Sequence, residues 1–198
     1  MSRRPNTRAL ILEASVDLFG SRGFAATSLD DIASVVGVAK QTLLYWFASK
    51  DELLDAVLAQ TAIELAAVIE AAVRAAPEEP LARIEAVVKA VFRPAVRRPQ
   101  LLGLVREVSR LAPVHAERLT RSVQPFVRRA IDYLRDEMDA GRLRRADPGL
   151  VIALAYATVT GIATEPEALR AVDWPVTPGG LRRLREELTA FVLAALRP

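Results

Sequence analysis

The sequence predicts an all-α protein, and three features of the chain support this fold class. Of its 198 residues, 52% are hydrophobic, and alanine is prominent among them. No run of β-branched residues bounded by turn residues is present, which argues against strands. Apolar residues instead recur at helical spacing, and capping residues stand before several of these runs. We expect a three-helix N-terminal domain over residues 1–52 and a second helical domain over residues 53–198.

The first predicted helix begins after Asn6, which is a plausible N-terminal cap. Its apolar residues follow helical spacing, and Gly20 and Gly23 end it. Phe24 is expected to pack back onto this helix. Residues 1–5 precede it as an arm whose Arg3 and Arg4 either reach a DNA backbone or minor groove or are simply disordered.

The segment Thr27–Lys50 predicts two short helices joined by a tight turn. Ser28 and Asp31 have the three-residue spacing of a capping box, which starts the first of these helices. Gly37 supplies the positive φ that a tight turn between helices needs. Leu43 and Trp46 continue the buried face on the second helix. This spacing is typical of a helix-turn-helix, whose second helix enters the major groove of DNA.

The polar face of the second helix predicts contacts with DNA. Lys40 and Gln41 can reach base edges, whereas Thr42 and Tyr45 can hold phosphates or a thymine methyl. Lys50 begins the next helix, where backbone amides favour phosphate. The candidate DNA-binding residues are Thr27, Ser28, Ala39, Lys40, Gln41, Thr42, Tyr45, Trp46 and Lys50. The alternative is an ordinary helical hairpin with a solvated polar face.

Residues 8–54 resemble the N-terminal domain of the tetracycline-repressor (TetR) family of bacterial transcription regulators. The matching residues are Arg8, Ile11, Leu12, Ala14, Leu18, Phe19, Gly23, Phe24, Thr27, Ser28, Ile32, Ala33, Gly37, Val38, Thr42, Leu43, Phe47, Lys50 and Leu53. The resemblance implies a cytoplasmic homodimer on a palindromic double-stranded DNA operator, whose grip a small molecule in the C-terminal domain loosens. Repression follows if the operator overlaps a promoter.

Two positions depart from the family pattern. Ala39 stands where the family usually has Ser or Thr, so the second helix lacks a hydroxyl at its start. Leu44 replaces the usual phosphate-binding tyrosine. Tyr45, one position along, and the indole N–H of Trp46 are the candidate replacements.

The second domain is expected to begin with a long connecting helix over residues 51–75, broken by Pro77 and Pro80. Helices over 81–96, 100–111 and 113–140 follow, and Pro125 should kink or interrupt the last of them. The resemblance implies that these three helices form a pocket for an unidentified, largely apolar ligand. The candidate lining residues are Phe92, Leu101, Leu104, Val105, Val108, His115, Leu119, Val123, Phe126 and Tyr156. Plain core fits each of them better than a ligand contact, and His115 fits a surface or capping role better than a contact in the pocket.

Two further helices, over residues 148–164 and after Thr177, are expected to pair with their copies in a four-helix dimer interface. A two-fold dimer would match a palindromic DNA site. The candidate interface residues are Val151, Leu154, Ala155, Thr158, Ile162, Leu181, Leu184, Leu188, Phe191, Val192 and Ala195. Packing of both helices within a monomer is the alternative.

Composition argues against several other classes of protein. With no cysteine, one histidine and no glycine-rich phosphate loop, we expect no metal site, no catalytic residues and no cofactor beyond the small-molecule effector. The longest uncharged run, residues 148–164, is shorter than the ~20 residues that span a bilayer, so no membrane partner is expected. A helical enzyme and a helical adaptor that binds protein remain as rival functions.

Overall fold

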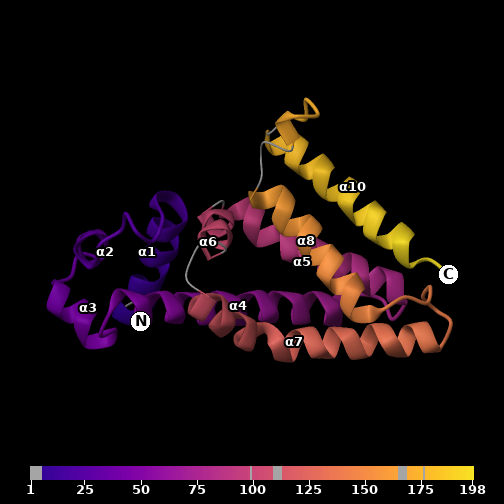
Figure 1. Ribbon diagram of the computed structural model, residues 1–198, viewed down its shortest axis with the longest axis horizontal. Helices are drawn as coiled ribbons and strands as arrows, with labels where there is room; N and C mark the ends of the chain where they lie inside the picture. The colour runs from indigo at the N-terminus through magenta and orange to yellow at the C-terminus, as the bar shows by residue number, and fades with distance from the viewer. Residues whose placement is uncertain (1–5, 99, 109–112, 165–168, 176) are drawn as a thin grey trace. The chain divides into compact units, whose positions relative to one another are not determined.

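The computed structural model describes the chain except for residues 1–5, 99, 109–112, 165–168 and 176 (Figure 1). The predicted N-terminal arm therefore lies outside the described residues. The described residues contain α-helices and no strand, which confirms the all-α fold class. The helices, labelled as in Figure 1, are α1 (Thr7–Arg22), α2 (Leu29–Val36), α3 (Lys40–Trp46), α4 (Lys50–Ala75), α5 (Pro80–Arg97), α6 (Gln100–Val108), α7 (Pro113–Asp139), α8 (Pro148–Thr164) and α10 (Pro178–Leu196).

The chain divides into two compact units, and the division is not a single cut in the sequence. The first, called here the head, contains residues 1–63 and 98–122, and the second, the body, contains residues 64–97 and 123–198. The boundary expected after residue 52 thus differs from the one observed. The reason is that α6 and the first turns of α7 pack with the N-terminal helices.

The core of the head gathers apolar residues from α1 to α4 and from α6. Ile11, Phe19, Ile32 and Leu43 are fully buried in it, as are Leu53, Leu54 and Val57 of α4. Asn6 caps α1 by accepting a hydrogen bond from the Arg8 amide at 3.1 Å. No two of these short helices could bury their apolar faces alone, so α1 and α4 complete the core around α2 and α3.

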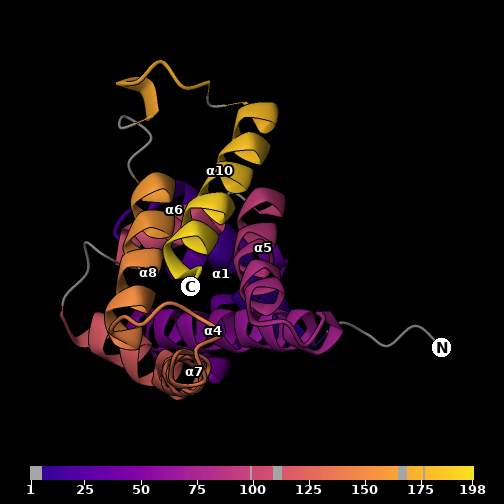
Figure 2. The same cartoon turned by 90° about the vertical axis from the view of Figure 1, so that its right-hand side faces the viewer.

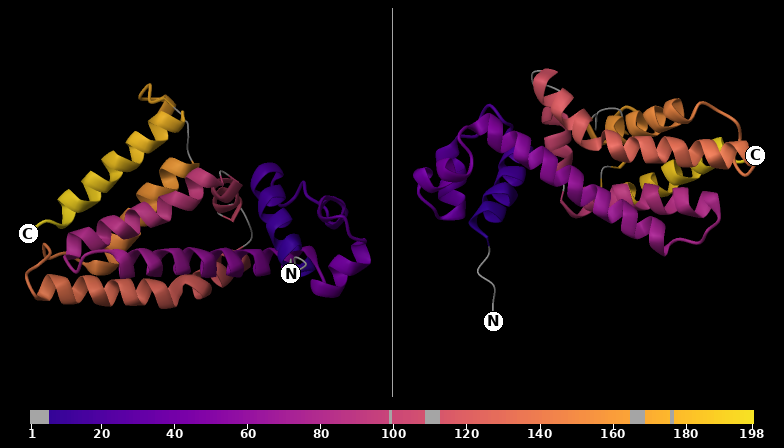
Figure 3. Two further views of the ribbon diagram at one scale, coloured as in Figure 1. Left: turned by 180° about the vertical axis from the view of Figure 1, so that it is seen from behind. Right: turned by 90° about the horizontal axis from the view of Figure 1, so that it is seen from below.

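Helix α6 lies directly on α1 (Figures 1 and 3), and the two backbones approach closely at Gly20 and Gly103. A Cβ added to Gly103 would stand 1.8 Å from the carbonyl oxygen of Gly20, so only glycine permits this approach. Arg98 pairs with Asp17 at 2.8 Å at one end of the contact. At the other end, the Glu107 carboxylate accepts a hydrogen bond from the Phe24 amide at 3.1 Å.

Helix α4 is the one described helix that is long and apolar enough, by length and composition, to cross a membrane. Its first half supplies Leu53, Leu54, Val57 and Leu58 to the core of the head. This use explains the apolar residues of that half, since a core helix carries the same residues as a membrane span.

The body has a separate core, which draws on four helices. Leu134 and Met138 of α7, Leu143, and Leu188, Val192 and Leu196 of α10 are buried together, and residues of α5 and α8 pack against them. Within this unit α7 runs alongside α4 (Figures 1 and 3), where Arg129 and Glu70 form an ion pair at 3.1 Å. Figure 2 shows α10 between α5 and α8 in projection, and α10 packs on α5.

The sequence made two local predictions for the body, a cap at Thr177 and a kink or interruption at Pro125. Thr177 caps α10 by accepting from the Gly180 amide at 3.1 Å, as predicted. Pro125 does not interrupt α7, which continues as one helix from Pro113 to Asp139, so the interruption is excluded and the alternative of a kink stays a prediction. A proline removes one intrahelical hydrogen bond, and the packing of the rest of this long helix compensates for that loss.

Candidate DNA-binding surface

The helix-turn-helix begins at a complete capping box. The Ser28 hydroxyl accepts from the Asp31 amide at 3.1 Å, and the Asp31 carboxylate accepts from the Ser28 amide at 2.8 Å. Hydrogen bonds from the Ser28 side chain and backbone hold the pKa of Asp31 below its usual value. The start of α2 is therefore specified by two residues three positions apart, as the sequence predicted.

The turn between α2 and α3 depends on Gly37, whose φ of 75° lies in the left-handed region. The Val38 amide donates to the carbonyl of Ala33 at 3.0 Å and closes the turn. Leu43 is then fully buried, so α3 is held by one face while its other face is left to solvent.

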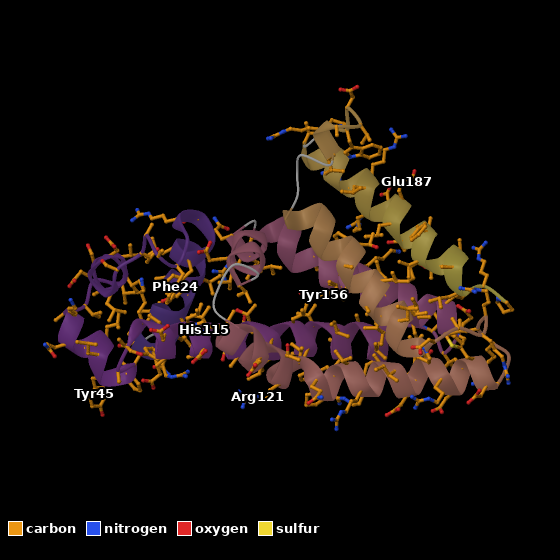
Figure 4. The ribbon with its side chains drawn as sticks, viewed as in Figure 1. Phe24, Tyr45, His115, Arg121, Tyr156 and Glu187 are labelled. Carbon is orange, nitrogen blue, oxygen red and sulfur yellow. The ribbon has the colours of Figure 1, made fainter. Side chains whose placement is uncertain are left out.

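The exposed face of α3 carries Lys40, Gln41, Thr42 and Tyr45. Tyr45 is 81% exposed, and Figure 4 shows it on the outside of the head. Its ring stands edge-on to the ring of Trp46, with centroids 5.4 Å apart. Ala39 makes no side-chain hydrogen bond to the start of α3, as expected from its departure from the family pattern. The predicted reading residues thus lie together on one solvent-facing surface.

Lys40 has an ion-pair partner that the sequence did not predict. Its ammonium nitrogen lies 2.7 Å from an Asp30 carboxylate oxygen, and both side chains are about half exposed. Asp30 belongs to the first turn of α2, ten residues earlier in the chain. The signal available in the sequence was a lysine at the start of a helix, where the helix dipole disfavours positive charge unless an acid neutralises it.

Two of the residues predicted to contact DNA have structural roles within the head. Thr27 is 1% exposed, and its hydroxyl donates to the Gly23 carbonyl at 2.8 Å. The Lys50 ammonium donates to the carbonyls of Phe24 and Thr27 at 2.9 and 3.0 Å and lies 4.3 Å from the centre of the Phe24 ring. Both side chains hold the loop between α1 and α2. The buried Thr27 side chain is not accessible to DNA, so that prediction is corrected, whereas the DNA contact of the half-buried Lys50 stays a prediction. Ser28 stays exposed beside them.

His115 is neither a surface residue nor a helix cap. It is 6% exposed, and its two ring nitrogens lie 3.2 Å from carboxylate oxygens of Asp51 and Asp55. Figure 4 shows it near Phe24 in the head, and the two rings are 6.2 Å apart between centroids. Asp51 and Asp55 stand one helical turn apart on α4, and that spacing was the sequence signal for a shared partner. His115 therefore attaches the start of α7 to α4.

The other predicted pocket residues divide between the two units. Leu104 and Val108 are buried in the core of the head, Leu101 packs against it, and Val105 is half-buried. In the body, Phe92, Val123 and Phe126 are half-buried, whereas Tyr156 is 63% exposed. The side chain of Leu119 lies outside the described residues. The pocket therefore stays a prediction.

A cleft of about 560 Å³ lies between α5 and α10 of the body, and it contains none of the predicted pocket residues. It is lined by Glu85, Lys89, Arg185, Glu186, Thr189, Ala190, Leu193, Ala194 and Arg197. Within the described part of the chain, no group of three or more His, Cys, Asp or Glu side chains is placed to hold a metal ion.

The predicted dimer residues fall into three groups. Leu154, Phe191 and Ala195 are exposed, the first two at 60% and 66%. Val151, Ala155, Thr158 and Leu184 are partly buried. Leu188 and Val192 belong to the core of the body, so their assignment to an interface is corrected. The side chains of Ile162 and Leu181 lie outside the described residues.

Comparison with known proteins supports the interpretation of the head as a helix-turn-helix domain. Residues 11–57 match the model of bacterial regulatory proteins of the tetR family. The chain is 30% identical over 165 residues to the HTH-type transcriptional regulator RutR of Escherichia coli strain K12, covering 82% of this chain and 76% of RutR. It is 46% identical over 55 residues to the HTH-type transcriptional repressor Rv3405c of Mycobacterium tuberculosis, covering 28% of this chain and 29% of that protein.

The similarity also extends over the whole fold. The crystal structure of the transcriptional regulator FadR from Bacillus subtilis in complex with stearoyl-CoA superimposes with a TM-score of 0.80 at 14% sequence identity. The match covers 94% of this chain and 98% of that one. Each of these relatives is a regulator of transcription by its name.

Proposed function

Because the chain belongs to the TetR family of bacterial transcription regulators, we propose that it represses transcription as a homodimer on a palindromic operator and is released by a small-molecule effector. The observation that carries the proposal is the exposed face of α3. Gln41, Thr42 and Tyr45 lie on it together, while Leu43 on the opposite face is fully buried. A helix packed in this way can present polar side chains to base edges while its apolar face stays buried in the core of the head.

Homodimer formation is supported by exposed apolar residues on the body. On α8, Leu150, Ala153, Leu154 and Ala157 are all exposed and follow the i, i+3, i+4, i+7 spacing of one helix face. On α10, the exposed Ala190, Phe191 and Ala194 form a second such face. Contiguous exposed apolar faces of this kind mark protein interfaces. A two-fold dimer would place two α3 helices one turn of DNA apart, about 34 Å or somewhat more.

The effector is proposed by class, as a small and largely apolar molecule in the body of a cytoplasmic protein. The FadR structure of the same fold holds stearoyl-CoA, so this arrangement of helices can accommodate such a ligand. The effector would act by binding one dimer state better than the other. A coupling of about 1–3 kcal/mol would change DNA affinity some 5- to 150-fold.

The test is a gel shift with DNA fragments that flank the protein's own gene. The same assay is then carried out with the double variant Gln41→Ala/Thr42→Ala. We expect the wild-type protein to bind one of these fragments at salt concentrations at which it no longer binds unrelated duplex DNA. The variant should lose about tenfold or more of its operator affinity, since a good base contact is worth about 1–3 kcal/mol. Its affinity for unrelated duplex should change little, because phosphate contacts supply nonspecific binding.

The matched control is Gln124→Ala, which removes an exposed glutamine from α7 in the body. This variant should bind the operator as the wild type does. Equal losses on operator and unrelated duplex in Gln41→Ala/Thr42→Ala would contradict the assignment of α3 as the reading helix. A wild type that retains no fragment, with or without added metabolite extract, would favour the adaptor alternative.

A further inference from the structure

The helix that we assign to the major groove carries one charged side chain, and that charge is already neutralised within the head. The sequence of α3 is KQTLLYW, in which Lys40 is the single ionisable cation. Its ammonium lies 2.7 Å from Asp30 Oδ2, a distance at which a charge-assisted hydrogen bond forms. Any phosphate or base edge that binds Lys40 therefore competes with a carboxylate for it.

Asp30 is available to pair with Lys40 because the neighbouring Asp31, and not Asp30, caps the start of α2. Asp31, at the third position of α2, holds both hydrogen bonds of the capping box with Ser28. In the described residues, Lys40 is the hydrogen-bond and ion-pair partner recorded for the Asp30 carboxylate. Removing Asp30 would thus free Lys40 while leaving the start of α2 intact.

The other described cations near α3 are also held within the head. Lys50 is directed at the carbonyls of Phe24 and Thr27, and the Arg8 guanidinium lies 5.4 Å from the centre of the Phe47 ring. Lys40 is about half exposed and is held by the side chain of Asp30, so it can be transferred from the protein to DNA. The strength of the ion pair between Lys40 and Asp30 then determines how much this transfer contributes to the affinity for DNA.

We propose that Asp30 is a positioning residue that limits DNA affinity, because its carboxylate holds Lys40 in the free protein and competes with DNA for it. This inference rests on the proposed function. A lysine that neutralises a phosphate releases a counterion from DNA, and this release drives nonspecific binding. A lysine that leaves Asp30 uncovers a negative charge beside the DNA, so the pair adds no net positive charge to the DNA-binding surface. The net counterion release from this contact is therefore close to zero in the wild type.

Asp30→Asn keeps the size and polarity of the side chain and removes its charge, so Lys40 becomes a free cation. Each head then gains about one counterion released on binding. The slope of log K against log salt should become steeper by about 0.9 for each engaged head. If the two affinities are equal at about 1 M salt, this slope corresponds to a gain of roughly eightfold in affinity per head at 0.1 M salt.

The experiment measures fluorescence anisotropy of a labelled random-sequence 30-base-pair duplex with the full-length chain between 0.05 and 0.3 M KCl (about this range resolves such slopes). Asp30→Asn is compared with Asp132→Asn, which removes an exposed, ion-paired carboxylate from α7 and makes the same change in net charge. Asp132→Asn should match the wild type in slope. Circular dichroism confirms that each variant is folded.

A double-mutant cycle with Lys40→Gln identifies the route of the effect. If Asp30 acts through Lys40, Asp30→Asn should change neither affinity nor slope in the Lys40→Gln background. An equal gain in both backgrounds, or an unchanged slope in Asp30→Asn alone, overturns the inference and leaves the proposed function standing. A wild type that binds no duplex even at the lowest salt overturns both.

Discussion

At the scale of single residues, Ser28 and Asp31 illustrate how two side chains specify the start of a helix. Ser28 bonds forward to the Asp31 amide, and Asp31 bonds back to the Ser28 amide. Two of the amides that a helix start leaves unpaired are satisfied in this way. Because α2 positions the turn and α3, the capping box supports the orientation of α3 in the head.

Ser28→Ala should lower the free energy of unfolding by about 1 kcal/mol, the usual cost of losing such a cap. Urea denaturation followed by circular dichroism measures this loss. Ser28→Thr, which keeps a hydroxyl at the position, is the control and should lie close to the wild type. A Ser28→Ala variant as stable as the wild type would mean that solvent caps α2 equally well.

The same pair predicts a dependence on pH. The pKa of Asp31 is lowered in the folded chain, so its contribution is present above the ordinary aspartate pKa of about 4 and is lost as pH falls through the folded value. The difference in stability between wild type and Ser28→Ala should therefore shrink in acid. A difference that is constant from neutral pH down to about pH 3 would exclude an ionic component of the capping box.

At the scale of helices, the contact between α1 and α6 determines which parts of the chain move together. Gly20 and Gly103 bring the two backbones into direct contact, and Arg98 and Glu107 bond to α1 and to the loop after it. His115 adds a contact from α7 to α4. These residues explain why the head includes a segment about 35 to 60 residues beyond the end of its continuous sequence.

Gly103→Ala should destabilise the head strongly. Its Cβ would lie 1.8 Å from the Gly20 carbonyl oxygen, a backbone atom that cannot rotate away, so α6 must shift from α1. Overpacking of this kind costs about 1–3 kcal/mol or more. Thermal unfolding measures the loss.

The control for this variant is Gly161→Ala on α8, where an added Cβ meets no atom within 4 Å. That change should leave stability equal or raise it by up to about 1 kcal/mol, since alanine favours a helix more than glycine does. If both variants behaved alike, the close approach of α1 and α6 would not be a feature of the protein in solution.

At the scale of the whole molecule, the exposed apolar faces of α8 and α10 are the features that a single chain leaves unexplained. Leu150 and Leu154 are 58% and 60% exposed, and Phe191 is 66% exposed. Exposure of this many large apolar side chains on neighbouring turns disfavours a monomer in water. A second copy that covers them would also provide the second head that a palindromic operator requires.

Phe191→Asp should therefore convert a dimer into a monomer of 21.6 kDa, as measured by size-exclusion chromatography with light scattering. A charge in the middle of an apolar interface is costly because it must be desolvated without a partner. Val172→Asp, at a residue that is 69% exposed and outside both helix faces, is the control and should remain dimeric. A Phe191→Asp variant that is still dimeric would place the interface elsewhere.

The sequence predicted the helices and the helix-turn-helix well because both depend on local spacing. The capping box, the left-handed Gly37 and the burial of Leu43 follow from residues within a few positions of each other. It failed for His115, whose partners Asp51 and Asp55 lie on another helix of the head. It missed Asp30 for the same reason, since the pair with Lys40 exists because α2 and α3 cross at the turn.

By itself, the sequence determined the helical class, the place of α3 and the family, since periodicity, caps and a dense local motif encode these directly. Only the tertiary structure decided which side chains on that helix are free, which are held within the protein, and which distant helices belong to the head. Those questions depend on contacts between segments up to about a hundred residues apart, and the side-chain chemistry of one segment does not specify which other segment it meets.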